Sequence, residues 1–211
     1  MAYQTGDNIL DDHYNAFANS NTNNINKIWG VGTGNYGYGQ SNTVDTVDVG
    51  DTVQASQWNT ILTRMRSIAD HQGTGITTAD SGQLATGDII AAISTIDADI
   101  TTLGNARTTA ASGNLTVSSD VTGTRTFTGS WTTSTVQEWK ITFAGGDEAR
   151  YFFNAGGYVQ FAGTLAGYTD REKSKDWENL LETRFGTFKM FSDTSSESGN
   201  ATPATNNTST G

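Results

Sequence analysis

The chain has 211 residues and a formal net charge of −10, and it contains no cysteine. An acidic surface repels phosphate and argues against nucleic-acid binding, while the lack of cysteine excludes disulfides, zinc thiolates and thiol catalysis. With 35% hydrophobic residues the chain is too polar for one thick core, yet its 5 Trp, 7 Tyr and 9 Phe argue against disorder throughout.

No apolar run reaches the roughly 18 residues that a membrane-spanning helix needs. The N-terminus also lacks the basic and apolar regions of a signal peptide. We therefore expect a protein that is made in the cytoplasm, does not insert into membranes and buries part of its surface between subunits.

The first helix is predicted from about Asn8 to Ile28, because its apolar residues lie three or four apart and share one face. Asn21 interrupts that face. Two interpretations stay open: the polar residue fixes the register of a continuous helix, or the helix breaks near residues 19–21.

A loop rich in glycine and aromatic residues follows at 29–41. It lacks the preceding strand and the Gly-Lys-Ser/Thr ending of a phosphate-binding loop, so its glycines indicate close packing or turns. Aromatic residues are enriched in protein interfaces, and we expect this half of the chain to dock onto other proteins. The candidate docking residues are Tyr14, Phe17, Trp29, Tyr36, Tyr38 and Trp58.

Two further helices are predicted, one from a cap at Ser56 to a stop at Gly73 and one from Thr86 or Asp88 onwards. The third helix has apolar residues at a 4-3-4-3 spacing, which is typical of a coiled-coil seam, and isoleucine at both seam positions favours trimers or tetramers over dimers. The alternative is an amphipathic helix packed within its own subunit. The candidate seam residues are Ile89, Ile93, Ile96, Ile100 and Leu103.

One phrase recurs in this half of the chain. A Gly-Asp pair and an aliphatic residue precede Tyr14-Asn15-Ala16-Phe17, and the same types precede Trp58-Asn59-Thr60-Ile61. A weaker copy begins at Gly87. Repetition at this spacing indicates stacked units that cannot bury their apolar faces alone, which is more typical of a building part than of a catalyst.

The composition shifts after Ala106, and strand patterns follow a linker at 108–113. In the segment 137–143, Trp139, Ile141 and Phe143 alternate with polar residues, so one face is expected to be buried. Further strands are predicted at 115–117, 124–128, 148–153, 158–161 and 187–191, with a hairpin turn at 145–147 and a short helix around Trp177. The expected fold class is α+β: a helical region 1–107 before a β-rich domain 114–191.

Residues 192–211 form a low-complexity polar tail. Because the sheet is expected to be unfinished at Phe191, this tail is expected to lead into a further C-terminal part.

Catalytic signatures are absent from the sequence. His13 and His71 are the two histidines, and Asp11-Asp12-His13 is better explained by acidic residues that favour a helix N-terminus. Asp97 and Asp99 could not be assigned to a site. We therefore predict no enzyme activity, no catalytic residues, no metal site and no cofactor, and leave bound calcium open because no twelve-residue calcium loop is present.

Several phrases together resemble the virion structural proteins of marine tailed bacteriophages, notably cyanophages, over about residues 6–191. The most specific phrase is Ala149-Arg150-Tyr151-Phe152-Phe153-Asn154-Ala155-Gly156-Gly157. The others are Asp12-His13-Tyr14-Asn15, Ile28-Trp29-Gly30, Gly37-Tyr38-Gly39-Gln40, Gln57-Trp58-Asn59, His71-Gln72-Gly73, Trp177-Glu178-Asn179-Leu180-Leu181 and Gly186-Thr187. The resemblance implies a component of the tail, neck or fibre and supplies no catalytic residues.

The sequence thus predicts a virion structural protein that forms a homo-oligomer, expected to be a trimer, and contacts other virion proteins. A capsid decoration protein is an alternative. Another is an adhesin-like module that binds glycans of the host surface, with Trp131, Tyr158 and Tyr168 as stacking residues.

Overall fold

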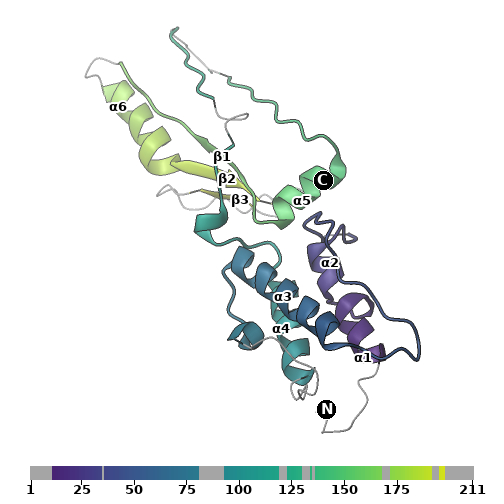
Figure 1. Ribbon diagram of the computed structural model, residues 1–211. Coiled ribbons are helices and arrows are strands. Elements are labelled where there is room, and N and C mark those ends of the chain that lie inside the picture. The colour runs from purple at the N-terminus through teal and green to yellow at the C-terminus, as the bar shows by residue number, and fades with distance from the viewer. Residues whose placement is uncertain are drawn as a thin grey trace.

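The computed structural model describes residues 11–34, 36–80, 93–118, 123–129, 134, 136–167, 172–191 and 195–197. Helices form one end of the molecule, and a small antiparallel sheet with two further helices forms the other (Figure 1). The fold class is therefore α+β, as predicted.

The N-terminal segment is two short helices and not one. α1 (Asp11–Asn15) continues into a π-turn, η1 (Ala16–Ser20), and α2 (Ile25–Trp29) follows after a break. Asn24 stabilises the break, because its Oδ1 accepts from Lys27 N at 2.8 Å while its Nδ2 donates to Asn21 O at 2.7 Å. The interpretation of a helix broken near residues 19–21 is confirmed, and that of a continuous helix is wrong.

The second predicted helix is confirmed as α3 (Ala55–Gln72), which ends at Gly73 with φ +68°. Its cap differs from the prediction: Gln54 N donates to Gln57 Oε1 at 2.7 Å, in a reciprocal capping box, and Ser56 lies inside the helix. The third predicted helix is confirmed over α4 (Ile93–Asn105), and its predicted start at Thr86 or Asp88 lies outside the described residues.

Asp99 of α4 has a structural role that the sequence did not reveal. The buried carboxylate accepts hydrogen bonds from Thr77 N at 3.1 Å and Thr78 N at 2.8 Å, at the start of the short helix η2 (Thr77–Asp80). Thr78 Oγ1 donates a third bond at 2.7 Å. Asp99 thus joins α4 to η2, as a charged side chain must be hydrogen-bonded when it is buried.

The described core lies entirely in the helical half. Its centre is Trp58, which is fully buried and packs edge-on against Tyr14 at 5.7 Å and Phe17 at 5.9 Å between ring centroids. The buried hydrophobic residues are Tyr14, Phe17, Ala18, Ile25, Ile28, Tyr38, Val44, Val47, Val53, Trp58, Ile61, Leu62, Met65, Ile68, Ala69, Ile96, Ile100 and Leu103.

The segment 41–54, which contains no helix or strand, is held against the helices by two asparagine side chains. The amide of Asn15 donates to Val47 O and accepts from Val47 N, both at 2.9 Å. The amide of Asn26 bonds Val44 O and Val44 N in the same way, both at 2.7 Å. Each amide satisfies a donor and an acceptor of the backbone, as a neighbouring strand would, while Val44 and Val47 enter the core.

The C-terminal half has fewer strands than predicted. Its elements are α5 (Gly146–Asn154), β1 (Val159–Ala162), α6 (Glu172–Glu178), which continues into the π-turn η4 (Asn179–Phe185), β2 (Thr187–Met190) and β3 (Ser195–Glu197). The strands pair antiparallel in the order β1-β2-β3, with Phe161 opposite Phe188. The predicted helix near Trp177 and the predicted strands at 158–161 and 187–191 are confirmed.

The predicted strand at 148–153 and hairpin turn at 145–147 are wrong, since these residues enter and form α5. Asp147 and Glu148 stand in its first turn, where acidic residues favour a helix, and Asp147 pairs with Arg150 one turn later at 3.1 Å. The predicted strands at 115–117, 124–128 and 137–143 are also wrong, because the described residues of 115–118, 123–129 and 136–143 are extended but belong to no strand. Figure 1 shows them as long arms that leave the body of the molecule.

Candidate functional site

The residues predicted to dock onto other proteins are internal. Tyr14, Phe17, Tyr38 and Trp58 are buried in the core of their own chain. Their aromatic character therefore serves packing within the chain, and the prediction that they form an outward docking surface is wrong for these four residues.

The two other docking candidates are partly buried against the same core. The indole of Trp29 donates to Asn42 Oδ1 at 2.8 Å. The ring of Tyr36 is covered by two cations, with Lys27 Nζ at 4.1 Å and the Arg107 guanidinium at 4.4 Å from its centroid. Neither ring is presented as an open anchor for a partner.

The predicted coiled-coil seam is internal as well. Ile96, Ile100 and Leu103 are at most 4% exposed and pack in the core that α3 shares. The alternative of an amphipathic helix packed within its own subunit accounts for these three residues, so their assignment to a seam between chains is corrected. Ile89 and the side chain of Ile93 lie outside the described residues.

Of the three glycan candidates, Trp131 and Tyr168 lie outside the described residues. Tyr158 is half-buried: its ring lies 5.4 Å from that of Phe191, and Lys189 Nζ stands 4.5 Å from its centroid. A cation over the face of Tyr158 occupies the surface on which a sugar would stack.

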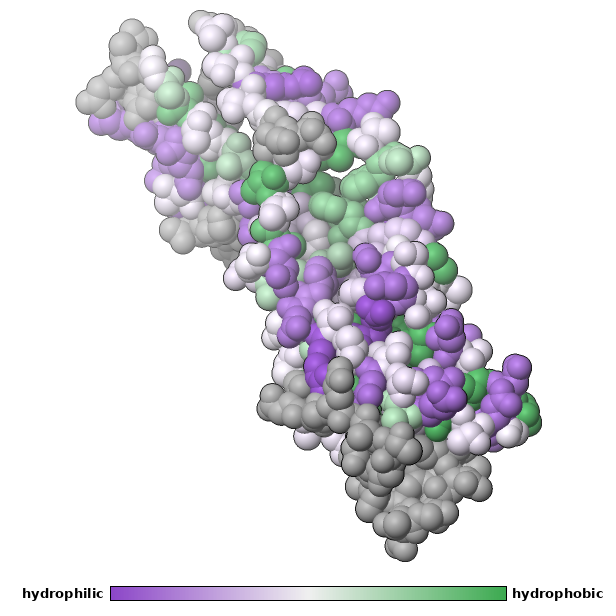
Figure 2. Space-filling model, in the orientation of Figure 1, coloured by the Kyte–Doolittle hydropathy of each residue, from purple (hydrophilic) through white to green (hydrophobic). Residues whose placement is uncertain are grey.

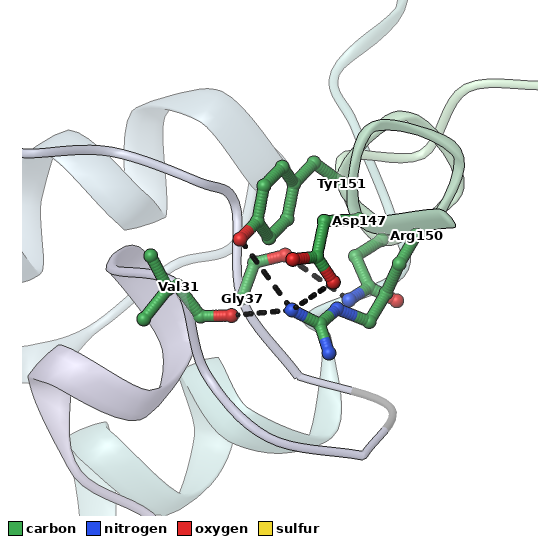
Figure 3. Close-up of polar contacts among 6 residues, drawn as sticks. Val31, Gly37, Asp147, Arg150 and Tyr151 are labelled. Carbon is green, nitrogen blue, oxygen red and sulfur yellow. Dashed lines mark hydrogen bonds and ion pairs between the residues drawn. The ribbon is translucent and has the colours of Figure 1, made fainter. Parts of the chain in front are cut away.

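The most specific phrase of the sequence joins the two halves of the molecule. Arg150 Nη2 donates to Val31 O at 2.9 Å and also pairs with Asp147 (Figure 3). One turn further along α5, the buried Asn154 donates from Nδ2 to Gly37 O at 3.0 Å. Helix α5 thus holds main-chain carbonyls of the glycine-rich loop.

Glycine is required in that loop because the ring of Tyr151 lies against it. A Cβ placed on Gly39 would stand 2.5 Å from Tyr151 Cδ2, and Gly39 has φ +72°. A similar close approach occurs at Gly156, where a Cβ would stand 2.8 Å from Ala110 of the segment 108–113. We refer to the contacts of Arg150, Tyr151 and Asn154 with the loop as the clamp.

The end of α3 completes the junction beside the clamp. His71 Nε2 donates to Ala155 O at 3.0 Å, since a carbonyl can only accept. The carbonyl of His71 accepts from Ala111 N at 2.9 Å and from Asn114 Nδ2 at 3.0 Å. His71 therefore ties α3 to the segments on both sides of the arms, a role that its place near a helix end did not indicate.

Burial raises the pKa of two core tyrosines to about 12. For Tyr14 the nearby Asp45 carboxylate adds to the effect of burial, and the hydroxyl donates to Asp45 O at 2.9 Å. At Tyr38 burial raises the pKa more than the hydrogen bond from Gln72 and the charge of Arg107 lower it. The Tyr38 hydroxyl donates to Arg107 O at 2.8 Å. Both phenols serve as neutral donors and offer no base at ordinary pH.

Aromatic side chains of the C-terminal half meet one another but stay open to solvent. Trp139 of an arm lies 5.9 Å from Phe161 of β1, Phe161 lies 6.5 Å from Phe188 of β2, and Phe188 stacks on Phe185 at 6.1 Å between centroids. We name these four residues the aromatic face. Trp139 is 42% exposed and Phe185 is 40% exposed, so this cluster is no closed core.

The contrast between the halves is general in the described part of the chain. Nine of the eleven large hydrophobic residues that are exposed lie between Val117 and Met190, and no hydrophobic residue of that stretch is among the buried core. Hydrophobic atoms are visible around α5 and the sheet in Figure 2. Exposed apolar side chains mark an interaction site where they form a contiguous patch.

Signs of metal or membrane chemistry were sought in the described residues. There, no three His, Asp or Glu side chains are grouped so that they could hold a metal ion. None of the described helices combines the length and the apolar character needed to cross a bilayer.

Comparisons of the chain with protein-family models, with curated proteins and with solved structures found no match.

Proposed function

We propose that this chain is a structural component of a tailed phage particle, located at the tail, neck or fibre, where it forms a homo-oligomer, expected to be a trimer. The observation that carries the proposal is the division of the molecule into a half with a closed aromatic core and a half with exposed apolar residues and extended arms. The place in a virion is proposed because the phrase at residues 149–157 resembles virion structural proteins of marine tailed bacteriophages.

The arrangement fits an assembly role because the two halves have different tasks. The N-terminal half buries its Trp58 cluster within its own chain, while the C-terminal half exposes Trp139, Phe152 and Trp177. Burial of such side chains between subunits stabilises an assembly by about 25 cal/mol per Å² of apolar surface. The polar surface of the N-terminal half then makes the contacts with other virion proteins, since its predicted docking residues are buried or partly buried in their own chain.

The proposal is tested on purified particles of the phage that encodes the chain. We expect peptide mass spectrometry to detect the chain in washed particles, and an antibody against the N-terminal half to label the tail, neck or fibre in electron micrographs. A tail protein of the same particle serves as the positive control. Absence from washed particles, with the chain confined to the host lysate, contradicts the proposal.

Host-glycan binding is a second candidate, and one hollow favours it. Lys173, Asp176, Trp177 and Leu180 line a shallow hollow of about 190 Å³ on α6 and η4, where an indole and two charged groups stand together. Sugars bind on such combinations of an aromatic face with polar groups. Binding of the full chain to host cells that is lost in Trp177→Ala, and kept in the control Val49→Ala, supports this function; unchanged binding of both variants contradicts it.

A further inference from the structure

We infer that the C-terminal half is completed by second copies of this chain, with the arm 136–143 of one copy added as a strand to the β1 edge of the next. The inference rests on the proposed self-association and states where it occurs. The N-terminal half keeps its own core in this assembly, so the subunits are joined through the sheet and the aromatic face.

The arm has the pattern of a strand but no sheet. Apolar and polar residues alternate in this arm, with Trp139, Ile141 and Phe143 at the apolar positions. In a strand these three side chains lie on one face, and covering that face stabilises the strand. In the single chain the segment is extended, meets β1 through the ring contact of Trp139 with Phe161, and leaves Trp139 42% exposed. An extended segment of this kind can act as the donor in strand addition.

The sheet offers a matching acceptor. Among the described strands β1 lies at an edge, because the order is β1-β2-β3. Edge strands present a row of backbone donors and acceptors, and proteins that stay monomeric protect them. β1 (Val159–Ala162) has no proline and no charged residue, so nothing in its own sequence blocks the approach of another strand.

The charge distribution favours like copies over an oppositely charged partner. Residues 1–112 carry four Lys or Arg and eleven Asp or Glu, a net −7. Residues 113–191 carry eight Lys or Arg and nine Asp or Glu, a net −1. The half that holds the arm and the open edge is therefore almost neutral, and copies can meet there with little repulsion even though the whole chain is at −10.

In each copy the arm 136–143 is the donor and the β1 edge is the acceptor, so the contact is head-to-tail. A head-to-tail contact generates a closed ring when the rotation between copies closes, and an open filament when it does not. A ring of copies agrees with the proposed trimer and uses the arm 136–143 and the β1 edge of every copy.

The first test measures the mass of the full chain by light scattering. We expect an oligomer for the unaltered chain, and the 22.5 kDa of one chain for Trp139→Glu and for Lys140→Pro. Proline removes a backbone donor from the added strand. Both residues are exposed, so the single chain tolerates these changes. Val49→Glu, at an exposed valine of the other half, is the matched control and keeps the oligomer.

A chain that is monomeric at every concentration overturns the inference, and so does an oligomer that Trp139→Glu and Lys140→Pro leave intact. The proposed place in the virion stands in either case if the chain is found in particles, whereas a monomer at every concentration also contradicts the proposed homo-oligomer. Dimers that both variants disperse support the inference and contradict the trimer. A dispersed variant must keep the far-ultraviolet circular dichroism of the control, which shows that it is folded.

The second test separates pairing between copies from pairing within one chain. Because the protein has no cysteine, Lys140→Cys and Gln160→Cys can be introduced without a background of other thiols. Chains that carry one change each, mixed with different tags and oxidised, are expected to form a covalent heterodimer, since neighbouring strands bring Cβ atoms within disulfide range. The inference is overturned if cross-linking occurs only inside the chain that carries both changes. Val49→Cys in place of either partner is the control.

Discussion

Asn154 of α5 donates a hydrogen bond from its Nδ2 to the carbonyl of Gly37 at 3.0 Å, across a separation of 117 residues. The bond is buried and links the sheet-bearing half to the glycine-rich loop of the helical half. Arg150 adds a bond to Val31 O one turn earlier, so the helix recognises backbone rather than side chains. The loop can therefore vary at several side chains while the attachment stays.

Loss of the Asn154 amide should loosen the junction. Asn154→Ala leaves the buried Gly37 carbonyl without its donor, and an unsatisfied buried group costs about 1–3 kcal/mol. We expect a lower denaturation midpoint and faster proteolysis in the segments next to α5. Asn105→Ala, at an exposed asparagine, is the control and should change neither. Equal proteolysis of both variants would contradict the role of the Asn154 amide in stabilising the junction.

Two glycines of the loop separate backbone strain from a steric clash. Gly34 and Gly39 both have positive φ, but a Cβ on Gly34 meets nothing within 4 Å, while one on Gly39 meets the Tyr151 ring at 2.5 Å. Alanine at either position strains the backbone by about 1–2 kcal/mol. Gly39→Ala should lose about 1–3 kcal/mol more through overpacking, measured by chemical denaturation. Tyr151→Ala should reduce this extra loss, and equal losses at the two glycines would contradict the clash.

The burial of Ile100 in its own chain predicts a stability loss that does not depend on concentration. Ile100→Ala should destabilise the protein by about 2–5 kcal/mol, because it leaves a cavity beside α3. Thermal unfolding followed at several protein concentrations distinguishes this from a seam between chains, in which the loss would grow on dilution. The comparison uses the Trp139→Glu background, so that self-association does not mask the effect.

The raised pKa values of Tyr14 and Tyr38 predict a loss of stability in alkali. Both phenols have a pKa of about 12 in the fold, against 10.0 for an ordinary tyrosine. Their neutral forms are favoured in the folded state, so this stability is complete below pH 10 and is lost as the pH rises towards 12. Denaturation of Tyr14→Phe between pH 9 and 12 should show a shallower decline, about that of one ionising group fewer. An unchanged slope would contradict the shift.

The helical half was largely predictable because its apolar periodicity is long and regular. The apolar stripe from Trp58 to Ala69 predicted α3, and Gly73 predicted where it ends. All the apolar residues of this stripe are buried. What covers such a stripe is not encoded in its spacing. A seam between chains and a core within one chain need the same isoleucines, and only the arrangement of α3 and α4 distinguishes them.

The segment around Arg150 was misassigned because a run of three consecutive aromatic residues is compatible with either a strand or a short helix. Tyr151, Phe152 and Phe153 have the propensity of a strand, whereas the acidic pair before them favours a helix start. The clamp itself depends on carbonyls of residues 31 and 37, more than a hundred positions away. No local pattern predicts such contacts, and only the many glycines of the loop 29–41 pointed to a close approach.

The segment 41–54 is anchored through its main chain, at Val44 by Asn26 and at Val47 by Asn15. The side chains of Asp45 and Thr46 between these anchors point to solvent. The anchoring hydrogen bonds therefore do not depend on which side chains stand at positions 45 and 46. A surface epitope or a short recognition peptide could be displayed there by the helical half, while Asn15 and Asn26 hold the main chain on both sides of it.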